Sequence, residues 1–499
     1  MEYASDIWKV LKNRIAALMK NNRLAKHWWR FFLAVFPLMV LWALSNPMFA
    51  APDEPFHMAR AQAAVQGQFG KIIETDGLPM GAVSCLAFKA EVTADCMDLT
   101  WGESPTAVEA IADSYPPLFY VLAGIPTFFF HGLFGAYLMR VWLAFICASL
   151  LGSAASLLYR RFGSSYVLVG WGFSVMPAVL FLSGSVNPSG VATSLAVLIW
   201  ALVLSGREQF GKRFEKNYEV ILGVVAVVFL LVRRDSILWL ALISLCLVVA
   251  KIGASKRKEG HWVKGGALVG VLGFVTYFSM KVWLSPIYAS WLSVDFQDSS
   301  EWKDGLSNTY LYLSQIIGWF GWMDTPIPEQ GRVLAAVVLL PFVFLGVATA
   351  RRQVQAAILL TAGLTVLLPI LIAEVQYPYF MGRYILPLAV GVPLLSGVAI
   401  ARREAELGKF LRHRLPLYFL SGWGCVHFYA FATNVRRNAV GFSGWWGHLG
   451  EADWRPPLLG NFTTLAFFAM MVAFSGALLY PLTKAEKAVS EKLGGGCDQ

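Results

Sequence analysis

The chain has 499 residues, of which 57% are hydrophobic and only 14% are charged. A soluble protein carries roughly 25% charged residues, and many apolar runs here reach or approach the ~20 residues that cross a bilayer. This composition predicts an all-α polytopic integral membrane protein and excludes a soluble enzyme. The formal charge of +10 indicates basic cytoplasmic loops rather than nucleic-acid binding, because Lys and Arg mark the loops that stay inside.

A polar and basic segment, residues 1–27, precedes the first apolar run. Ile7, Leu11, Ile15 and Leu18 recur there at helical spacing among lysines and arginines. This pattern predicts a basic amphipathic helix lying on the cytoplasmic surface. It does not fit a cleavable signal peptide, because the polar stretch is long and no small-residue cleavage site follows the apolar run.

Short basic loops divide the rest of the chain into about 12 predicted transmembrane helices, with a range of about 11 to 14. We expect a transmembrane domain over 28–482 and a cytoplasmic polar tail over 483–499. The basic loops predicted to face the cytoplasm are 207–216, 251–264, 350–352, 401–414 and the tail. The loops predicted to face outside, which hold most of the acidic residues, are 51–117, 184–188, 233–235, 286–331, 374–383 and 434–458.

One apolar stretch, 117–131, disturbs this alternation. It is short and contains Pro126, and a crossing there would place Arg160 and Arg161 outside. We therefore expect an interfacial or re-entrant helix on the outer face.

The first outer loop, 51–117, is the largest polar element and contains Cys85 and Cys96. An oxidising outer compartment favours a disulfide between them, and their separation is compatible with its geometry. Three cysteines in predicted spans are expected to be small core residues: Cys147, Cys246 and Cys425.

No motif of a soluble enzyme is present: there is no GxxxxGK[ST] phosphate loop, no HExxH and no CxxC pair with zinc spacing. Polar clusters instead recur beside Pro or Gly at the predicted outer ends of helices. They are "PDEPFH" (52–57), "DSYPPLFY" (113–120), "SGSVNPSG" (183–190), "RRD" (233–235), "GWFGWMDTPIP" (318–328) and "QYPYFMGRYILP" (376–387). Ionisable groups near a bilayer are costly and usually functional. The clusters predict a cavity at the outer leaflet, with carboxylates for acid–base chemistry and guanidiniums for an anion.

In chain order, "PDEPFH", "YPPLFY", "SVNPSG", "GWFGWMDTP" and "GRYILP" resemble the motifs of a bacterial membrane protein family, domain of unknown function 2142. The resemblance covers about residues 30–400 and departs at Ser189, where the family usually has Asp after "NP". The family is in turn similar in layout to GT-C glycosyltransferases, such as protein mannosyltransferases and aminoarabinose or arabinofuranosyl transferases. The resemblance implies a GT-C-like helical bundle in a bacterial plasma membrane, with its active site on the outer face.

The resemblance also implies a reaction. A sugar would pass, with inversion, from a polyprenyl-phosphate donor to an extracytoplasmic glycan, lipid or protein of the cell envelope. A carboxylate early in the first outer loop would be the general base; here it is Asp53 or Glu54, and the motif position favours Asp53. The phosphate leaving group needs charge stabilisation, which Arg supplies best. The candidate substrate-binding residues are His57, Tyr115, Asn187, Arg234, Asp324, Tyr377, Arg383 and Tyr384.

Other interpretations stay open. Asp53 and Glu54 are also an ordinary start signal for a helix beginning at Pro55, and a divalent cation held by these two acids and His57 is an alternative. No other cofactor is indicated. Four tryptophans of the outer loops are most simply an interface belt, with stacking on a sugar as the alternative: Trp291, Trp302, Trp319 and Trp322.

Three further functions compete with sugar transfer. They are transport or flipping of a lipid-linked envelope intermediate, polymerisation or ligation of a glycan, and a scaffold role in envelope synthesis. Transporters usually carry ionisable residues at the bilayer midplane on broken helices, often in two repeated halves. The spans 188–206 and 384–400 lack charge and no repeat is visible, which favours the transferase over the transporter.

Overall fold

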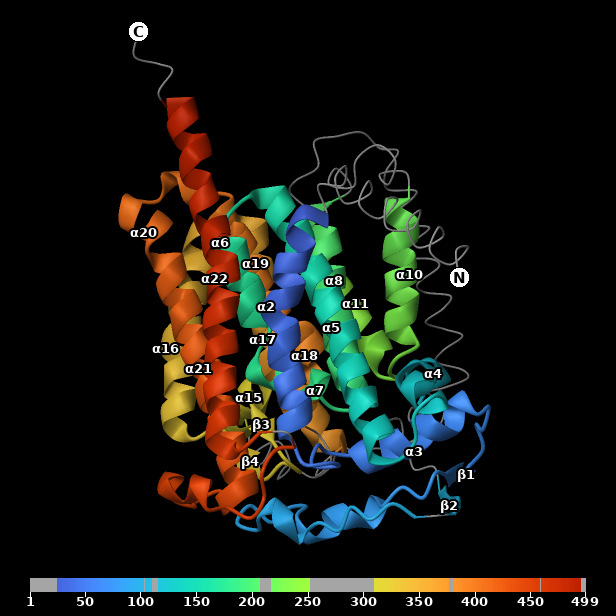
Figure 1. Ribbon diagram of the computed structural model, residues 1–499. Helices are drawn as coiled ribbons and strands as arrows, with labels where there is room; N and C mark the ends of the chain where they lie inside the picture. Colours follow the sequence, from blue (N-terminus) through green and yellow to red (C-terminus); the bar gives the residue numbers. More distant parts are fainter. Residues whose placement is uncertain are drawn as a thin grey trace, which may run out of the picture.

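The computed structural model describes residues 25–102, 104–109, 115–206, 217–251, 309–376, 381–457 and 459–494. They form a bundle of helices that run roughly along one axis, with short helices and small sheets gathered at one end (Figure 1). We call this the α3 end, because it carries α3 (Glu54–Val65). We call the opposite end the basic end, because Arg160, Arg161 and Arg402 lie there.

Several sequence predictions lie outside the described residues. They concern most of the amphipathic segment 1–27, the loop 207–216, the stretch 252–308 with Trp291 and Trp302, and residues 377–380 with Tyr377.

Seven helical segments of the described residues are long and apolar enough to cross a bilayer. They comprise α2 (Ala25–Ser45), α5 (Gly132–Phe162), α8 (Pro188–Ser205), α16 (Glu329–Thr349), α17 (Arg352–Gln376), the run of η6 (Gly382–Ile385), α18 (Leu386–Ala389) and α19 (Gly391–Ala401), and α22 (Asn461–Gly494). An eighth is the pair α6 (Ser165–Ser174) and α7 (Pro177–Ser183), bent by 61°. The bend falls where Pro177 has no backbone N–H to continue a helix. The predicted all-α polytopic fold is confirmed, whereas the count of about 12 spans stays a prediction.

Shorter or more polar helices complete the described part of the bundle. They are α10 (Tyr218–Leu230), α11 (Ser236–Lys251), α15 (Thr309–Ile317), α20 (Lys409–His413) and α21 (Leu415–Val440).

The apolar stretch after the first outer loop stays at the α3 end. α4 (Pro117–Gly124) and η3 (Ile125–Phe128) are together too short for a span and pack against α3 (Figure 1). A Cβ at Gly124 would lie 2.1 Å from the Ala61 carbonyl oxygen, so this close packing needs glycine. α5 then runs to the basic end, where Arg160 and Arg161 stand in its last turn, as the alternation of loops requires.

Buried aromatic rings close the core near the α3 end. Trp42 of α2 is fully buried, and its ring packs against Phe181 of α7 and Phe320 of the two-residue strand β3 (Trp319–Phe320). β3 pairs with β4 (Thr325–Pro326) in a tight hairpin. The hairpin is thereby fixed to the ends of α2 and α7.

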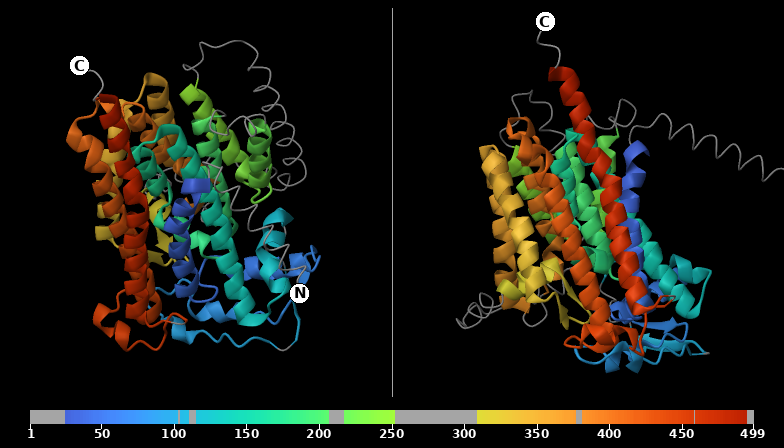
Figure 2. Two further views of the ribbon diagram at one scale, coloured as in Figure 1. Left: turned by 45° about the horizontal axis from the view of Figure 1, so that its top comes forward. Right: turned by 60° about the vertical axis from the view of Figure 1, so that its left-hand side comes forward.

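The segment after α3 lies across the α3 end of the bundle (Figure 2). β1 (Ile72–Thr75) pairs antiparallel with β2 (Thr106–Glu109), in a register that sets Ile73 opposite Val108. Between these strands lie η1 (Met80–Cys85) and η2 (Ala94–Cys96). Cys85 and Cys96 form a disulfide with Cα atoms 6.2 Å apart, the pairing that the sequence analysis expects.

Candidate active site

Glu54 and Arg140 form an ion pair that is sealed from solvent. Arg140 Nε donates to Glu54 Oε1 at 2.8 Å and Nη2 donates to Oε2 at 2.5 Å. Both side chains are 0% exposed, and the backbone N–H of Val186 also donates to Oε1 at 2.9 Å. No acceptor hydroxyl can reach this carboxylate without opening the protein.

Arg140 also satisfies the end of α2. Its remaining N–H groups donate to the carbonyls of Ala43, Asn46 and Pro47 at 2.8–3.0 Å. The last carbonyls of a helix have no partner within the helix, and a cation there is favoured by the helix dipole. The pair therefore joins α2, α3, α5 and the turn before α8. Sequence reasoning missed Arg140; the signal was a lone charge inside an apolar run.

The Asp53 side chain points away from the Glu54–Arg140 pair, although Asp53 directly precedes Glu54 in the chain. Its backbone is in the left-handed region, with φ 64°, and its side chain makes no capping hydrogen bond to α3. The carboxylate is 44% exposed and pairs with Arg383, with Oδ2 2.6 Å from Nη2. The helix-cap interpretation thus does not describe the Asp53 side chain. Asp53 is the acidic residue of the dipeptide that a substrate can approach.

Asn187 fixes the backbone just before Asp53. It is 2% exposed and caps α8, its Oδ1 accepting from the Ser189 N–H at 2.9 Å. Its Nδ2 donates to the carbonyl of Pro52 at 3.1 Å. The "NP" motif therefore positions the candidate base through the main chain.

Arg383 is buried beside Asp53 with donor capacity to spare. It lies in η6 and is 6% exposed. Its Nε and Nη1 are buried and have no hydrogen-bond partner among the described protein groups other than Tyr384. Buried donors are normally satisfied, so these two atoms suit an anion entering from the Asp53 side.

A second arginine, Arg233, lies near Arg383 and contacts the same tyrosine ring. Arg233 binds Asp235 through two hydrogen bonds of 2.8 and 2.7 Å and donates to Ser189 Oγ at 2.6 Å. The ring of Tyr384 lies 5.0 Å from the Arg233 guanidinium and 5.3 Å from that of Arg383. Such contacts are attractive, because the ring face is electron-rich. Tyr384 thus lets two cations share one small region.

His57, Tyr115 and Arg234 form the flank of the site. His57 Nδ1 lies 3.0 Å from the Tyr120 hydroxyl, its ring centroid is 5.9 Å from that of Tyr115, and the Arg234 guanidinium is 5.7 Å from the Tyr115 ring. Burial lowers the pKa of His57 to about 4; the Asp53 carboxylate opposes this, and nearby guanidiniums add to it. His57 is therefore neutral at neutral pH. It contacts its neighbours by a hydrogen bond to Tyr120 and by packing against Tyr115.

The charge of this group favours an anion. The guanidiniums of Arg233, Arg234 and Arg383 stand against the carboxylates of Asp53 and Asp235. Ser189, at the position where the resemblance expects Asp, offers Arg233 a neutral hydroxyl. Three guanidiniums therefore gather around this group.

Asp324 lies in a different constellation. Its side chain is 6% exposed and pairs with Arg437 at 2.6 Å, and Thr325 Oγ1 donates to it at 2.8 Å. Arg437 also donates to the carbonyls of Leu86, Lys89 and Val92. Asp324 thus braces the loop between the two disulfide cysteines; its predicted contact with substrate stays a prediction.

The residues suggested for a divalent cation do not converge. Asp53 pairs with Arg383, Glu54 with Arg140 and His57 with Tyr120. Among the described residues there is no group of three His, Cys, Asp or Glu side chains able to hold a metal ion.

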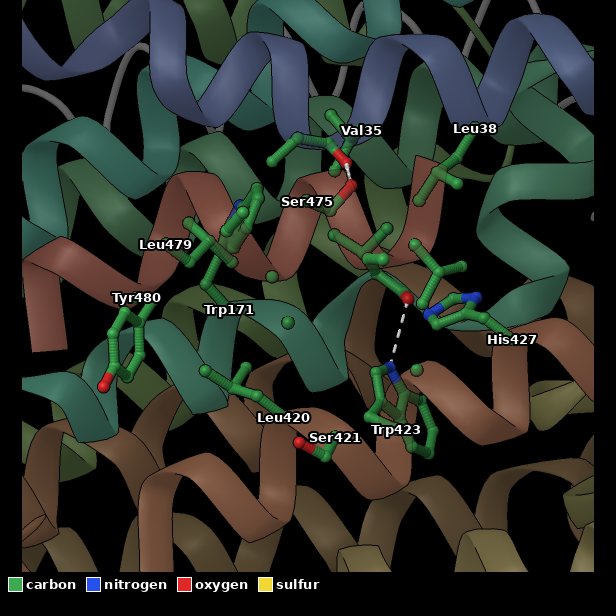
Figure 3. Close-up of a pocket in the computed structure, with 18 of the residues that line it drawn as sticks. Val35, Leu38, Trp171, Leu420, Ser421, Trp423, His427, Ser475, Leu479 and Tyr480 are labelled. Carbon is green, nitrogen blue, oxygen red and sulfur yellow. Dashed lines mark hydrogen bonds between the residues drawn. The ribbon is translucent and has the colours of Figure 1, made fainter. Parts of the chain in front are cut away.

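A separate hollow of about 470 Å³ lies between α2, α6, α21 and α22. Figure 3 shows Leu38, Trp171, Leu420 and Leu479 around it, with the His427 ring at one side. Its lining is mostly apolar and includes none of the predicted site residues. It suits hydrocarbon rather than the reacting groups of a substrate.

The family model described as "Predicted membrane protein (DUF2142)" matches residues 36–392, more than half of the chain. The chain belongs to the DUF2142 family. The match includes Asp53, Asn187, Arg233 and Arg383, and it ends before α21 and α22.

Two similar solved structures are both of ArnT from Cupriavidus metallidurans. The apo state has 15% identity, a TM-score of 0.43, and a match covering 92% of this chain and 78% of ArnT. ArnT bound to undecaprenyl phosphate has 16% identity, a TM-score of 0.44, and a match covering 94% and 80%. No curated protein matches this DUF2142 chain.

We predict that Glu54→Gln destabilises the fold by roughly 3–5 kcal/mol, because it leaves the buried Arg140 without its counter-charge. Asp53→Asn is the matched control one residue away; its carboxylate is half exposed, so the change should be much smaller. Thermal unfolding of the purified protein in detergent measures both. Equal losses for the two variants would contradict the division of roles.

We also predict a pH dependence that belongs to His57. Between its folded pKa of about 4 and the ordinary value near 6.5, the unfolded chain binds a proton that the folded protein does not. Stability therefore falls as the pH drops through this window, by roughly 3 kcal/mol at most. His57→Gln should make the fall of the thermal midpoint between pH 7 and 4.5 shallower, whereas His448→Gln, at an exposed position, should leave the slope as it is.

Proposed function

We propose that this DUF2142 protein is a membrane glycosyltransferase that transfers a sugar from a polyprenyl-phosphate donor to an acceptor of the cell envelope. The observation that carries this proposal is the Asp53–Arg383 pair. It offers an exposed carboxylate next to a buried guanidinium that has two spare N–H donors. The Asp53 carboxylate can accept a proton from a hydroxyl, and the Arg383 guanidinium can bind a phosphate. The two groups are joined by a hydrogen bond.

We infer that the α3 end faces the outside of the bacterial plasma membrane. The Cys85–Cys96 disulfide lies in the segment across this end, and disulfides persist in oxidising compartments. Arg160 and Arg161 end α5 at the other end of the bundle, where Arg402 and Arg403 follow α19. Short arginine-rich connections favour the cytoplasm. A lipid-linked donor fits the outer side of the membrane, where we place the α3 end.

The donor phosphate and Asp53 compete for Arg383 in the proposed mechanism. In the free protein, the guanidinium binds the carboxylate and holds it in place. A phosphate that binds the Nε–Nη2 or the Nη1–Nη2 edge of the guanidinium shares Nη2 with Asp53, which weakens the ion pair and makes the carboxylate a better base. Arg is suited to this exchange, because its planar fork binds oxyanions in a bidentate way.

The transfer then proceeds in one displacement. The acceptor oxygen attacks the anomeric carbon while the bond from that carbon to the phosphate oxygen breaks. Asp53 accepts the proton of the acceptor hydroxyl, and the electron pair of the broken bond leaves with the polyprenyl phosphate. The guanidiniums of Arg233, Arg234 and Arg383 stabilise this leaving group as its negative charge grows. A single displacement inverts the anomeric configuration.

The other predicted residues take positioning or binding roles. Asn187 holds the Pro52 carbonyl and so the direction of Asp53. Tyr384 keeps Arg233 and Arg383 apart at a fixed distance. Glu54 supports the fold beneath the site, so we propose Asp53 alone as the base. His57 and Tyr115 offer hydrogen bonds to the sugar.

We predict that Asp53→Asn lowers transfer at least ~100-fold, the usual contribution of a general base. The assay combines the reconstituted protein, radiolabelled polyprenyl-phosphate sugars and an envelope extract. Glu109→Gln, at an exposed position of the same outer loop, is the control and should transfer like the native protein. Native-like transfer by folded Asp53→Asn would refute the assignment of the base.

We predict that Arg383→Lys raises the KM for the donor about tenfold or more, because lysine keeps the charge but loses the bidentate geometry. Donor-dependence curves measure this effect at saturating acceptor. Arg403→Lys, exposed at the basic end, should leave the KM unchanged. An unaltered KM in a normally folded Arg383→Lys variant would contradict the proposal that Arg383 binds the donor phosphate.

A further inference from the structure

Phe88 is held in a conformation that is unfavourable on two counts. Its backbone φ is 61°, in the left-handed region, which is a genuine outlier for a bulky side chain. Its side chain is 70% exposed to solvent. Strained residues of this kind persist only where the surroundings fix them, and they cluster at functional sites.

The surrounding loop is fixed by several independent contacts. The disulfide Cys85–Cys96 closes it, and the buried Arg437 binds three of its carbonyls at 2.9–3.1 Å. The Ala90 carbonyl accepts from the Phe442 N–H at 2.9 Å. The Glu91 carboxylate accepts from the N–H and hydroxyl of Ser443. The loop therefore cannot relax to bury Phe88.

Phe88 belongs to a series of aromatic residues that are linked to one another through Trp322 and Phe49. Its ring stands edge-on to Trp322, with centroids 5.6 Å apart. Trp322 Nε1 donates to the carbonyl of Phe49 at 2.9 Å, and the Phe49 ring lies 6.5 Å from that of Trp101. We call Phe88, Trp322 and Trp101 the aromatic strip.

The strip adjoins the Asp53–Arg383 pair through two connections. Phe49, which holds Trp322, precedes Asp53 by four residues. Met323, the neighbour of Trp322, also has a positive φ of 59° and lines one small cavity with Pro52 and Arg383. The strip and the Asp53–Arg383 pair therefore belong to neighbouring parts of the same end of the protein.

We propose that the aromatic strip binds the acceptor and that the acceptor is a carbohydrate. This inference rests on the proposed transferase function and chooses among glycan, lipid and protein acceptors. The apolar C–H face of a sugar ring packs on an aromatic ring, while its hydroxyls need polar partners. Phe88 is exposed among polar groups, with Lys89, Glu91 and Asp95 exposed nearby. A lipid or an apolar peptide would require a continuous apolar groove instead.

The conformational strain offers a sharp test. Phe88→Gly removes the ring and also supplies the residue that best tolerates positive φ. We expect this variant to be as stable as the native protein or more stable, yet to bind carbohydrate about tenfold more weakly. A residue with only a structural role would not lose binding while keeping stability. Phe69→Gly, at a 51% exposed position of the same outer loop, is the control.

The probes are neutral tetrasaccharides of glucose, mannose, galactose and arabinose, with the full-length protein in nanodiscs. Saturation-transfer NMR measures binding, and thermal unfolding measures stability. Loss of binding in Phe88→Gly but not in Phe69→Gly supports the inference. Native-like binding by Phe88→Gly overturns it, as does binding of no tetrasaccharide by the native protein. A loss of nanodisc insertion in Phe88→Gly would assign the ring to the membrane surface and likewise overturn it.

A parallel assay separates this inference from the transferase proposal. Release of sugar from the donor to water, without acceptor, depends on the donor site around Asp53 and Arg383. Phe88→Gly should release sugar at the native rate while its KM for acceptor rises. If no donor is consumed but tetrasaccharides bind through Phe88, the transferase proposal fails and the carbohydrate site stands.

Discussion

The buried pair of Glu54 and Arg140 is the interaction on which the arrangement at the α3 end depends. Taking both charges out of water costs several kcal/mol, which only good geometry and further hydrogen bonds repay. The structure supplies both, through two hydrogen bonds within the pair, the Val186 N–H and three carbonyls at the end of α2. One guanidinium thereby sets where α2 ends, where α3 begins and how both meet α5.

This anchor explains why two adjacent acids follow the first span. Glu54 is turned inward by Arg140, and the left-handed backbone at Asp53 turns the next carboxylate toward Arg383 and solvent. Asp accepts that backbone region more readily than most residues. The dipeptide thus separates a buried structural carboxylate from one that is open to solvent. The two roles depend on each other, because the buried Glu54–Arg140 pair fixes the backbone that carries the exposed Asp53 carboxylate.

The sequence anticipated much of this and missed specific parts for physical reasons. Apolar run lengths predicted an all-α membrane fold and the short helix near Pro126, and the pairing of Cys85 with Cys96 was expected. Motif order brought Asp53, Asn187, Arg383 and Tyr384 together. Arg140 and Arg437 escaped notice because their partners lie 86 and 113 residues away, and tertiary packing alone decides such pairings. The positive φ of Asp53 and Phe88 is likewise invisible in a sequence without glycine at those positions.

The braces of Phe88 come from a part of the chain distinct from the donor site. Asp53, Arg233 and Arg383 lie within residues 36–392, which the family model matches, whereas Arg437, Phe442 and Ser443 lie on or just after α21. The loop that carries Phe88 is thus supported from outside the matched region, whereas Phe88 itself and the Asp53–Arg383 pair lie inside it. Exchange of α21 between relatives would therefore alter the support of the loop that carries Phe88 while leaving the Asp53–Arg383 pair as it is.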